Sequence, residues 1–503
     1  MNENKLQSIV IVGGGTAGWM TASALSKFLS GQNVKIRLIE SEELGTIGVG
    51  EATVPMIQNF NGILGIDEVE FVKKTCASFK LGIDFRSWGK LNNRFFHPFG
   101  DFGENVEGVP PHHHWLKLKM MGDETPIGDY SFSTVAAHEN RFAPPPSDKR
   151  LAVAAYKYAY HFDAILYAKL LREYSEAAGV QRTEGKISNA KLRASDGFIS
   201  SVVLESGEKI YGDLFIDCSG FQGLLIEKTL KTGYVDWSRW LPCNRAIAAP
   251  CELKGHFSPY TRSTAHEAGW QWRIPLQHRV GNGYVYSNNF IDDATAEAKF
   301  IESLEGPVLA RPRLLKFVTG HRKRYWNKNC VAIGLAAGFL EPLESSSIQL
   351  IQTAIIRLIS FFPDKNFDPV IINEFNRITQ NEYDGIRDFL IAHYCLGERD
   401  DAELWKYCRA MELPDSLKGR IELFKSCGNI SLFAEDSYRE PSWVSIFMGL
   451  GLTPKRYDPF VDRVSDKVLV AGMKHRREEI RKIVSTMPLH SRYIAEVCPA
   501  KSF

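Results

Sequence analysis

Residues 9–25, IVIVGGGTAGWMTASAL, decide the fold of this 503-residue chain, because they join two kinds of secondary structure through a run of glycines. The β-branched apolar run from Ser8 to Val12 is typical of a buried parallel strand. The glycines that a tight turn needs follow with the spacing G-x-G-x-x-G, at Gly13, Gly15 and Gly18. Residues 19–29 then continue as a helix. The segment predicts a strand, a tight turn and a helix in direct succession.

A turn of this kind indicates a dinucleotide site. Its glycines let the backbone approach a pyrophosphate, and the helix N-terminus offers N–H groups and a positive dipole end. The next strand, VKIRLIE, ends in Glu40, which lies 22 residues after Gly18 (40 − 18), where a carboxylate takes ribose hydroxyls. We therefore predict a Rossmann-type α/β unit that binds the dinucleotide through the three glycines, Thr16, Ala17 and Glu40.

The sequence after this unit favours FAD over NAD. A dehydrogenase would continue with further βαβ repeats, whereas residues 43–56 read ELGTIGVGEATVPM, a long glycine-rich loop. Short apolar strands that run into small residues return only at 213–226 and 329–342. Such late returns resemble the flavin monooxygenase class of folds, which wraps an extended FAD. No second G-x-G-x-x-G follows a strand, so we expect no stable NAD(P)H domain and a flavin that arrives already reduced.

The remaining patterns divide the chain into two parts. Residues 163–178 and 346–362 have helical periodicity, and strands are expected near 198–204 and over 209–217. Helical patterns dominate from there to the C-terminus. We predict an FAD-binding domain over residues 1–350, interleaved with segments of a substrate site, and a mainly helical C-terminal lobe over 351–503 that completes the substrate pocket.

Composition excludes several classes of protein. The formal net charge of +2 offers no electrostatic basis for binding nucleic acid. The nine cysteines include no CxxC pair, which argues against a disulfide framework or a structural zinc site. The first apolar run passes straight into glycines, so it is a strand and not a signal peptide, and no apolar run is long enough to cross a membrane. A cytoplasmic protein is expected.

Two residues stand out as candidates for chemistry. In CASFKLGIDF, apolar side chains alternate with Lys80, so a strand would send Lys80 to the opposite face, and the pattern alone indicates a surface lysine. Glu344, in GFLEPLESSSIQL, lies at the start of a long helix, where exposed N–H groups form an anion site. The alternative is that a serine caps this helix and the glutamates are ordinary acids of its first turn.

The triplet His112-His113-His114 does not predict a metal site. Adjacent histidines point in different directions on a strand, and no acidic or cysteine cluster supplies partners at ligand spacing. We predict no metal.

Taken together, these segments resemble the flavin-dependent tryptophan halogenases over nearly the whole chain. The motif that separates this family from ordinary flavin hydroxylases is WxWxIP, which stands here as WQWRIP at residues 270–275. The other matching stretches are GGGTAGW (13–19), GVGEATVP (48–55), FK (79–80), HPFG (97–100), YAYHFDAILYAKLL (158–171), DLFIDCSGFQGLLI (213–226), EPLES (341–345) and RDFLIAHY (387–394).

The resemblance implies a mechanism. Reduced FAD, oxygen and chloride or bromide generate hypohalous acid, which diffuses through an internal passage to a separate substrate site. There Lys80 matches the family's essential lysine, which either hydrogen-bonds the hypohalous acid or forms a haloamine. Glu344 matches a carboxylate that stabilises the cationic arene and takes its proton.

The resemblance also assigns binding residues. The halide would lie on the backbone amides of Ser346 and Ser347, where the family more commonly has Thr-Gly. His97 and Phe99 match aromatic walls that stack on the substrate indole. Further cofactor-binding positions are expected at Val49, Gly50, Ala52, Ile187, Leu335 and Ile348.

One departure from the family bears on the substrate. Tryptophan-specific members carry a Tyr-Tyr-Glu and Phe-Trp cluster that grips the amino-acid backbone, whereas residues 431–451 read SLFAEDSYREPSWVSIFMGLG. We therefore expect an indole or another electron-rich arene without a zwitterion. A separate NAD(P)H-dependent flavin reductase would supply reduced FAD, and a homodimer is left open. The alternatives are an FAD-dependent aromatic hydroxylase and a non-catalytic flavin-binding protein.

Overall fold

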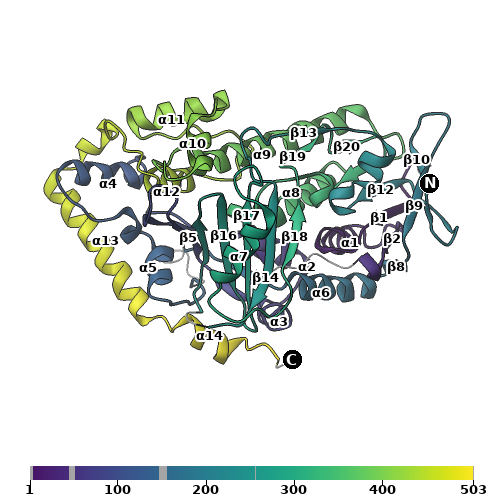
Figure 1. Cartoon of the computed structure of the whole chain (residues 1–503), viewed down its shortest axis with the longest axis horizontal. Helices are drawn as coiled ribbons and strands as arrows, with labels where there is room; N and C mark the ends of the chain where they lie inside the picture. The colour runs from purple at the N-terminus through teal and green to yellow at the C-terminus, as the bar shows by residue number, and fades with distance from the viewer. Residues whose placement is uncertain (1–3, 45–50, 147–155, 255–256, 502–503) are drawn as a thin grey trace.

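The structure is a computed structural model that describes residues 4–44, 51–146, 156–254 and 257–501. Two large sheets organise it, and the seven-stranded one lies in the middle of the molecule (Figure 1). The sheet that contains β1 lies at one end of the molecule, and helix α13 (Asp466–Thr486) lies at the other.

The first sheet contains the segment that opens the chain. β1 (Ser8–Val12) is a central strand of this sheet. Four of its five residues are buried, as the sequence predicts. The order is β20 (Trp326–Asn327), β21 (Cys330–Ala332), β12 (Leu214–Asp217), β1, β2 (Lys35–Glu40) and β8 (Gln181–Glu184). All neighbours are parallel except β20 and β21. This confirms the Rossmann-type α/β prediction, including the late returns of β12 and β21 to the sheet.

Helix α1 (Thr16–Phe28) leaves the glycine turn and packs against two helices from distant parts of the chain. These are α6 (Ala164–Ala177) and α8 (Ser346–Ser360), both of which the sequence predicts with slightly longer bounds. The Asp163 carboxylate caps α6 by accepting hydrogen bonds from the backbone N–H groups of Ile165 and Leu166. Of the three helices, α1 contacts β1 and β2 of the sheet directly.

The second sheet has seven strands and contains the WQWRIP motif. Its order is β18 (Arg313–Lys316), β14 (Arg245–Cys251), β17 (Val280–Tyr286), β16 (Gly269–Pro275), β15 (Thr261–Ala265), β5 (Gly82–Arg86) and β6 (Arg94–Pro98). Every residue of β16 and β17 is buried, so both faces of this sheet are covered. The motif therefore lies in the interior.

The described residues also form three smaller sheets of three strands each. They are β3 (Glu51–Ala52), β7 (Ala159–Phe162) and β4 (Ser78–Lys80); β11 (Lys209–Tyr211), β10 (Ile199–Leu204) and β9 (Ile187–Leu192); and β13 (Tyr234–Asp236), β19 (Gly320–Arg322) and β22 (Gly338–Phe339).

The single strand expected over residues 209–217 is wrong. The chain bends between Tyr211 and Leu214, because the Asp213 carboxylate accepts hydrogen bonds from the backbone N–H groups of Gln7 and Ser8 at 2.7 and 3.0 Å. β11 and β12 consequently belong to different sheets.

After Phe339 the described residues form helices and no strand. The long α9 (Pro369–Cys395) runs beside α8, and the others are α10 (Glu403–Ala410), α11 (Asp415–Cys427), α12 (Glu440–Gly449), α13 and α14 (His490–Val497). The helices of the first part are α2 (Met56–Leu64), α3 (Glu68–Lys74), α4 (Pro111–Met120), α5 (Phe132–His138) and α7 (Asp293–Glu302). None of the described helices is long and apolar enough to span a membrane.

The histidine triplet lies on helix α4, which begins at Pro111. The His112 Nε2 atom lies 2.9 Å from the Gly428 carbonyl oxygen, and the His113 Nε2 atom lies 2.8 Å from the Asn429 Oδ1 atom. These histidines connect α4 to the end of α11. Within the described ranges, no group of three histidine, cysteine or acidic side chains is arranged to hold a metal ion.

The glycine turn generates a prediction about stability. A Cβ atom at Gly18 would lie 1.8 Å from the Gly13 carbonyl oxygen, whereas a Cβ atom at Gly15 would meet nothing within 4 Å. We expect Gly18→Ala to lower the free energy of unfolding by about 2 kcal/mol or more. Gly15→Ala, the matched control, should stay within about 0.5 kcal/mol. Chemical denaturation of the cofactor-free proteins measures both, and equal stability of the two variants would contradict the turn geometry.

Candidate active site

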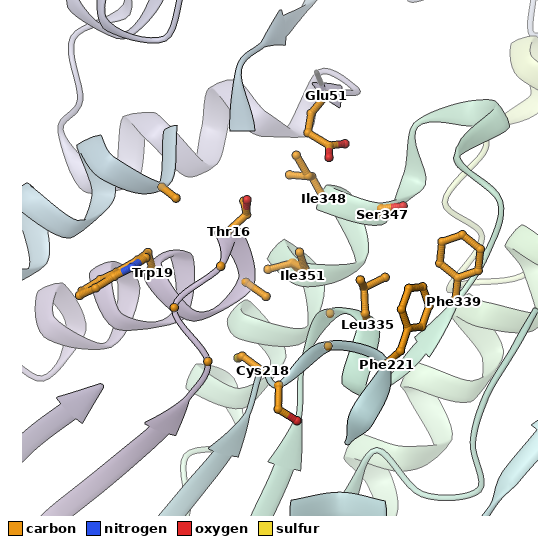
Figure 2. A pocket seen from close by; sticks show the side chains of 18 of the residues that line it. Thr16, Trp19, Glu51, Cys218, Phe221, Leu335, Phe339, Ser347, Ile348 and Ile351 are labelled. Atoms are coloured by element: carbon orange, nitrogen blue, oxygen red, sulfur yellow. The ribbon is translucent and has the colours of Figure 1, made fainter. Parts of the chain in front are cut away.

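A cavity of 830 Å³ lies at the carboxyl ends of β1 and β2, between α1 and α8 (Figure 2). Its volume is in the range of cofactor sites. It extends from Glu40 to the turn that precedes α8, and Thr16, Leu335 and Ile348 face its interior (Figure 2). The predicted cofactor-binding residues that line it are Gly13, Gly15, Thr16, Ala17, Glu40, Ala52, Ile187, Leu335 and Ile348.

Of the remaining predicted cofactor residues, Gly18 is described by the structure and does not line this cavity. Gly18 lies behind the turn, against the Gly13 carbonyl oxygen. Val49 and Gly50 lie outside the described residues.

Glu40 lies at the end of β2 and already has partners. Its Oε1 atom accepts a 2.5 Å hydrogen bond from the Arg182 Nε atom, and its Oε2 atom accepts one of 3.2 Å from the Trp19 indole N–H. Since both oxygens are held by the protein, the carboxylate is fixed in orientation at the cavity wall.

The turn between β22 and α8 carries the EPLES motif. Pro342–Glu344 form one 3-10 turn, and Ser345 then adopts a left-handed conformation (φ 61°, ψ 31°) before α8 begins at Ser346. The Ser345 side chain does not cap the helix. The serine-cap alternative is therefore wrong, and the first amides of α8 receive nothing from the Ser345 hydroxyl. Ser345 and Ser347 line the cavity, whereas Ser346 is buried outside its lining.

Lys80 is completely buried, so the prediction of a surface lysine from its sequence pattern is wrong. The reason is that residues 78–86 are not one strand: β4 ends at Lys80, Leu81 intervenes, and β5 begins at Gly82 in a different sheet. Strand alternation therefore does not continue across Leu81.

The Lys80 ammonium has partners on several sides. Its Nζ atom donates to the Ser345 Oγ atom at 2.8 Å and to the Thr53 carbonyl oxygen at 3.0 Å, and it lies 5.0 Å from the centre of the Phe99 ring. Burial lowers the pKa of Lys80 to about 7, although the charge of Glu344 opposes this shift. Near neutral pH the amine can therefore exist with or without its proton.

Glu344 is buried between two histidines. The His97 Nδ1 atom lies 2.9 Å from its Oε2 atom, and the His393 Nε2 atom lies 2.9 Å from its Oε1 atom. Burial alone raises the pKa of Glu344, but the nearby histidine charges and hydrogen bonds outweigh it and lower the pKa to about 2. Glu344 is therefore an ionised carboxylate near neutral pH.

The predicted substrate walls lie on the same side as Lys80 and Glu344. His97 is in β6 and packs edge-on against the Phe389 ring, and Phe99 follows the end of β6 and contacts the Lys80 ammonium. Sequence reasoning missed that His97 also binds Glu344. No local signal could have found this contact, because 247 residues separate the two.

A second carboxylate in the same turn has the opposite character. The Glu341 Oε2 atom accepts hydrogen bonds from the Trp270 indole N–H (2.9 Å) and the Tyr394 hydroxyl (2.6 Å). Burial raises the pKa of Glu341 to about 7, against the effect of these two donors. Trp270 thus connects the WQWRIP strand to the EPLES turn, which supplies a structural reason for the first tryptophan that the sequence did not reveal.

The second tryptophan of the motif forms part of the cavity wall. Trp272 lines the cavity, and its ring covers Gly283, where a Cβ atom would lie 2.1 Å from the ring carbons. Of the two tryptophans, only Trp272 is exposed to the cavity.

The family model described as tryptophan halogenase matches residues 8–466. The chain is 37% identical to the tryptophan 6-halogenase ThaL of Streptomyces albogriseolus, over 90% of this chain and 91% of the relative. Among solved structures it resembles Xcc4156, a flavin-dependent halogenase from Xanthomonas campestris, with a TM-score of 0.96 and 44% identity, covering 99% of this chain and all of the other. It also resembles BrvH, a flavin-dependent halogenase from Brevundimonas sp. BAL3, with a TM-score of 0.95 and 42% identity, covering 99% of this chain and 100% of that one.

These similarities cover the chain almost from end to end, and they favour halogenation over the hydroxylase and non-catalytic alternatives. They agree with the FAD-binding class of fold that the first sheet indicates. This chain belongs to the tryptophan halogenase family and is an FAD-dependent enzyme that halogenates an aromatic substrate.

Proposed function

We propose that this enzyme makes hypohalous acid from chloride or bromide and molecular oxygen, and that Lys80 and Glu344 direct the halogen onto an indole or a similar electron-rich arene. The observation that carries the proposal is the contact between Lys80 and Ser345. Ser345 lines the large cavity, and its hydroxyl accepts a hydrogen bond from the buried lysine behind it. The amine is therefore in direct contact with a side chain of the cavity wall.

The residues of the cavity fit FAD. Gly15 is open to the cavity and adjoins the N-terminus of α1, where a pyrophosphate would meet backbone N–H groups. Glu40 lies at a distance along the chain and at a strand end that suit a ribose. When bound and reduced, the flavin supplies the electrons that activate oxygen toward the halide. A separate NAD(P)H-dependent flavin reductase would deliver it, since the sequence has no second dinucleotide motif.

The start of α8 suits the halide. Ser346 and Ser347 are the first two helical residues, whose backbone N–H groups have no partner within a helix. The Ser345 hydroxyl is engaged with Lys80 and does not cap these amides. An anion at this end of α8 would be stabilised by the amides and by the helix dipole, beside the flavin cavity.

Lys80 and Glu344 would perform different parts of the substitution. Lys80 can donate a hydrogen bond to hypohalous acid when protonated, or form a haloamine when neutral, and its pKa of about 7 permits both. Glu344 is negatively charged, so it stabilises the cation that forms when the arene takes the halogen. The carboxylate then accepts the proton that leaves the ring carbon.

The region that grips an amino acid in tryptophan-specific enzymes supports a substrate without a zwitterion. Asp436 and Arg420 are buried there and form an ion pair with each other at 2.7 Å. Tyr438 stacks on Phe389 with ring centres 3.9 Å apart, so its ring is also engaged within the protein. A carboxylate and an ammonium group of a substrate would have to disrupt this packing.

Removal of the Lys80 amine provides a test of function. We expect Lys80→Ala to lower the rate of bromination with reduced FAD, oxygen and bromide by roughly 100-fold or more, because the oxidant is no longer positioned. FAD binding, followed by flavin fluorescence, should persist, because Lys80 does not line the cavity. Lys74→Ala, at an exposed position at the end of α3, is the control. Full bromination by Lys80→Ala, or an oxygenated product formed without halide, would rule out the proposal.

Burial of Lys80 also predicts that this catalytic lysine lowers the free energy of unfolding of the protein. Its pKa is lowered from 10.5 to about 7 in the folded protein, so the ammonium destabilises the fold below pH 7 and this effect disappears as the pH rises to 10.5. Lys80→Met should therefore unfold with a free energy higher by roughly 2–5 kcal/mol at pH 6. The gain should shrink steadily toward pH 10. A gain that is independent of pH would show that the lysine is not the source.

The substrate proposal predicts a preference that a single competition measures. With reduced FAD, oxygen and bromide, we expect a higher kcat/KM for indole than for tryptophan, because residues 431–451 lack the recognisable Tyr-Tyr-Glu and Phe-Trp cluster that grips the amino-acid backbone. Product ratios from equimolar mixtures measure the preference directly. Faster bromination of tryptophan would overturn the substrate proposal while leaving halogenation intact.

A further inference from the structure

The last turns of α9 present two consecutive side chains to the EPLES turn, and one of them has no role in the function described so far. Tyr394 donates a hydrogen bond to Glu341, and His393 contacts Glu344. His393 is completely buried. The halogen transfer described above assigns no step to His393, so its role has to come from its own contacts.

The hydrogen-bond partners of His393 demand two protons on its ring. The Nδ1 atom lies 2.8 Å from the Phe389 carbonyl oxygen, which can only accept, so Nδ1 must carry a hydrogen. The Nε2 atom lies 2.9 Å from the Glu344 Oε1 atom. A neutral ring with its hydrogen on Nδ1 would present a lone pair to this carboxylate, which is repulsive. A second proton must therefore lie between Nε2 and Oε1.

His490 shows what a buried neutral histidine does in the same protein. Its Nδ1 atom also faces a carbonyl oxygen, that of Phe257 at 3.0 Å, but its Nε2 atom accepts a hydrogen bond of 3.2 Å from the Phe79 backbone N–H. One ring proton satisfies both contacts, and burial lowers the pKa of His490 to about 4. His393 differs only in facing an acceptor where His490 faces a donor.

The second proton belongs to His393 and not to Glu344. The His97 ring also contacts the carboxylate, with Nδ1 at 2.9 Å from Oε2, and Lys80 adds a further positive charge nearby. Tyr438 is a further titratable group beside this carboxylate, and its hydroxyl donates to the Glu344 backbone oxygen at 3.4 Å. The rings of Phe85, Trp88 and Phe389 pack around His393. Every charged neighbour thus favours the carboxylate form of Glu344.

We propose that His393 is a positioning residue that carries a positive charge in the resting enzyme and holds Glu344 as an ionised, oriented carboxylate. The proposal rests on the role assigned to Glu344 above. Oε1 is held by His393, and Oε2, which the His97 Nδ1 atom contacts at 2.9 Å, has a second lone pair that can take the proton from the arene. When the ring C–H bond breaks, its electron pair restores aromaticity and the proton binds Oε2. Since His393 balances the charge of Glu344, Lys80 is free to lose its own proton.

The ring protons of His393 can be observed without any turnover. In FAD-loaded protein labelled with ¹⁵N-histidine, His393→Phe identifies the His393 signals by their loss. We expect both ring nitrogens to be protonated at neutral pH, and only Nδ1 to be protonated in Glu344→Gln, whose amide can donate to Nε2. A singly protonated His393 in the unaltered enzyme would overturn the proposal, whatever the enzyme halogenates.

Kinetics test whether His393 acts through Glu344. His393→Phe should slow single-turnover bromination by about 10-fold or more and produce a primary isotope effect with indole deuterated at the brominated carbon, because proton removal becomes slow. FAD binding should be unchanged. His393→Gln keeps a donor toward Oε1, so it should restore part of the rate and remove part of the isotope effect.

The double variant completes this test. Adding His393→Phe to Glu344→Gln should slow the reaction no further, since residues that act as a unit are not additive. Losses that multiply, or a His393→Phe enzyme that shows no isotope effect, would overturn the proposal. If the unaltered enzyme brominates nothing, the proposed function fails instead, and the protonation state of His393 is still decided by the ring signals.

Discussion

A lysine and two glutamates are buried around one short turn, away from the bulk solvent that would stabilise their charges. Glu341 and Glu344 belong to the turn that ends at Ser345, and Lys80 donates a hydrogen bond to the Ser345 hydroxyl. An unpaired charge in such a place is strongly unfavourable, so each group must either be neutral or be supplied with partners by the protein. The rest of the site follows from how the fold meets this requirement.

The two carboxylates meet it in opposite ways. Glu341 has donors that are neutral, an indole and a phenol, so burial dominates and its pKa rises. Glu344 has imidazoles, and its pKa falls. Near neutral pH Glu344 is therefore ionised, whereas Glu341, three positions away and with a pKa of about 7, is only partly ionised. The partners come from β6, β16 and α9, which explains why such distant segments must pack together here.

The extent to which the sequence predicted this arrangement depends on distance along the chain. β1, the glycine turn, α1 and the end of β2 at Glu40 were predictable because strand composition, turn glycines and helix periodicity are local properties. Resemblance to a family then identified Lys80 and Glu344 as candidates. The burial of Lys80 was not predictable, since it depends on a change of sheet at Leu81 that no periodicity records.

The partners of Glu344 and Glu341 could not be predicted from the sequence for the same reason. The residues His97 and His393 are 247 and 49 positions from Glu344, and Trp270 is 71 positions from Glu341. A histidine or tryptophan in a buried strand or helix gives the same local pattern whether it packs against apolar side chains or binds a carboxylate. Only the tertiary structure distinguishes these outcomes.

The pairing of Trp272 with Gly283 limits how the cavity can be redesigned. The two residues face each other on adjacent strands β16 and β17, and the indole occupies the space that any side chain at position 283 would need. A smaller residue at position 272 would open a hollow beside the cofactor that Gly283 is unable to fill, while a larger residue at position 283 would push the indole into the cavity. Engineers who wish to reshape this wall must therefore exchange both residues in one step, since each single change passes through a poorly packed intermediate.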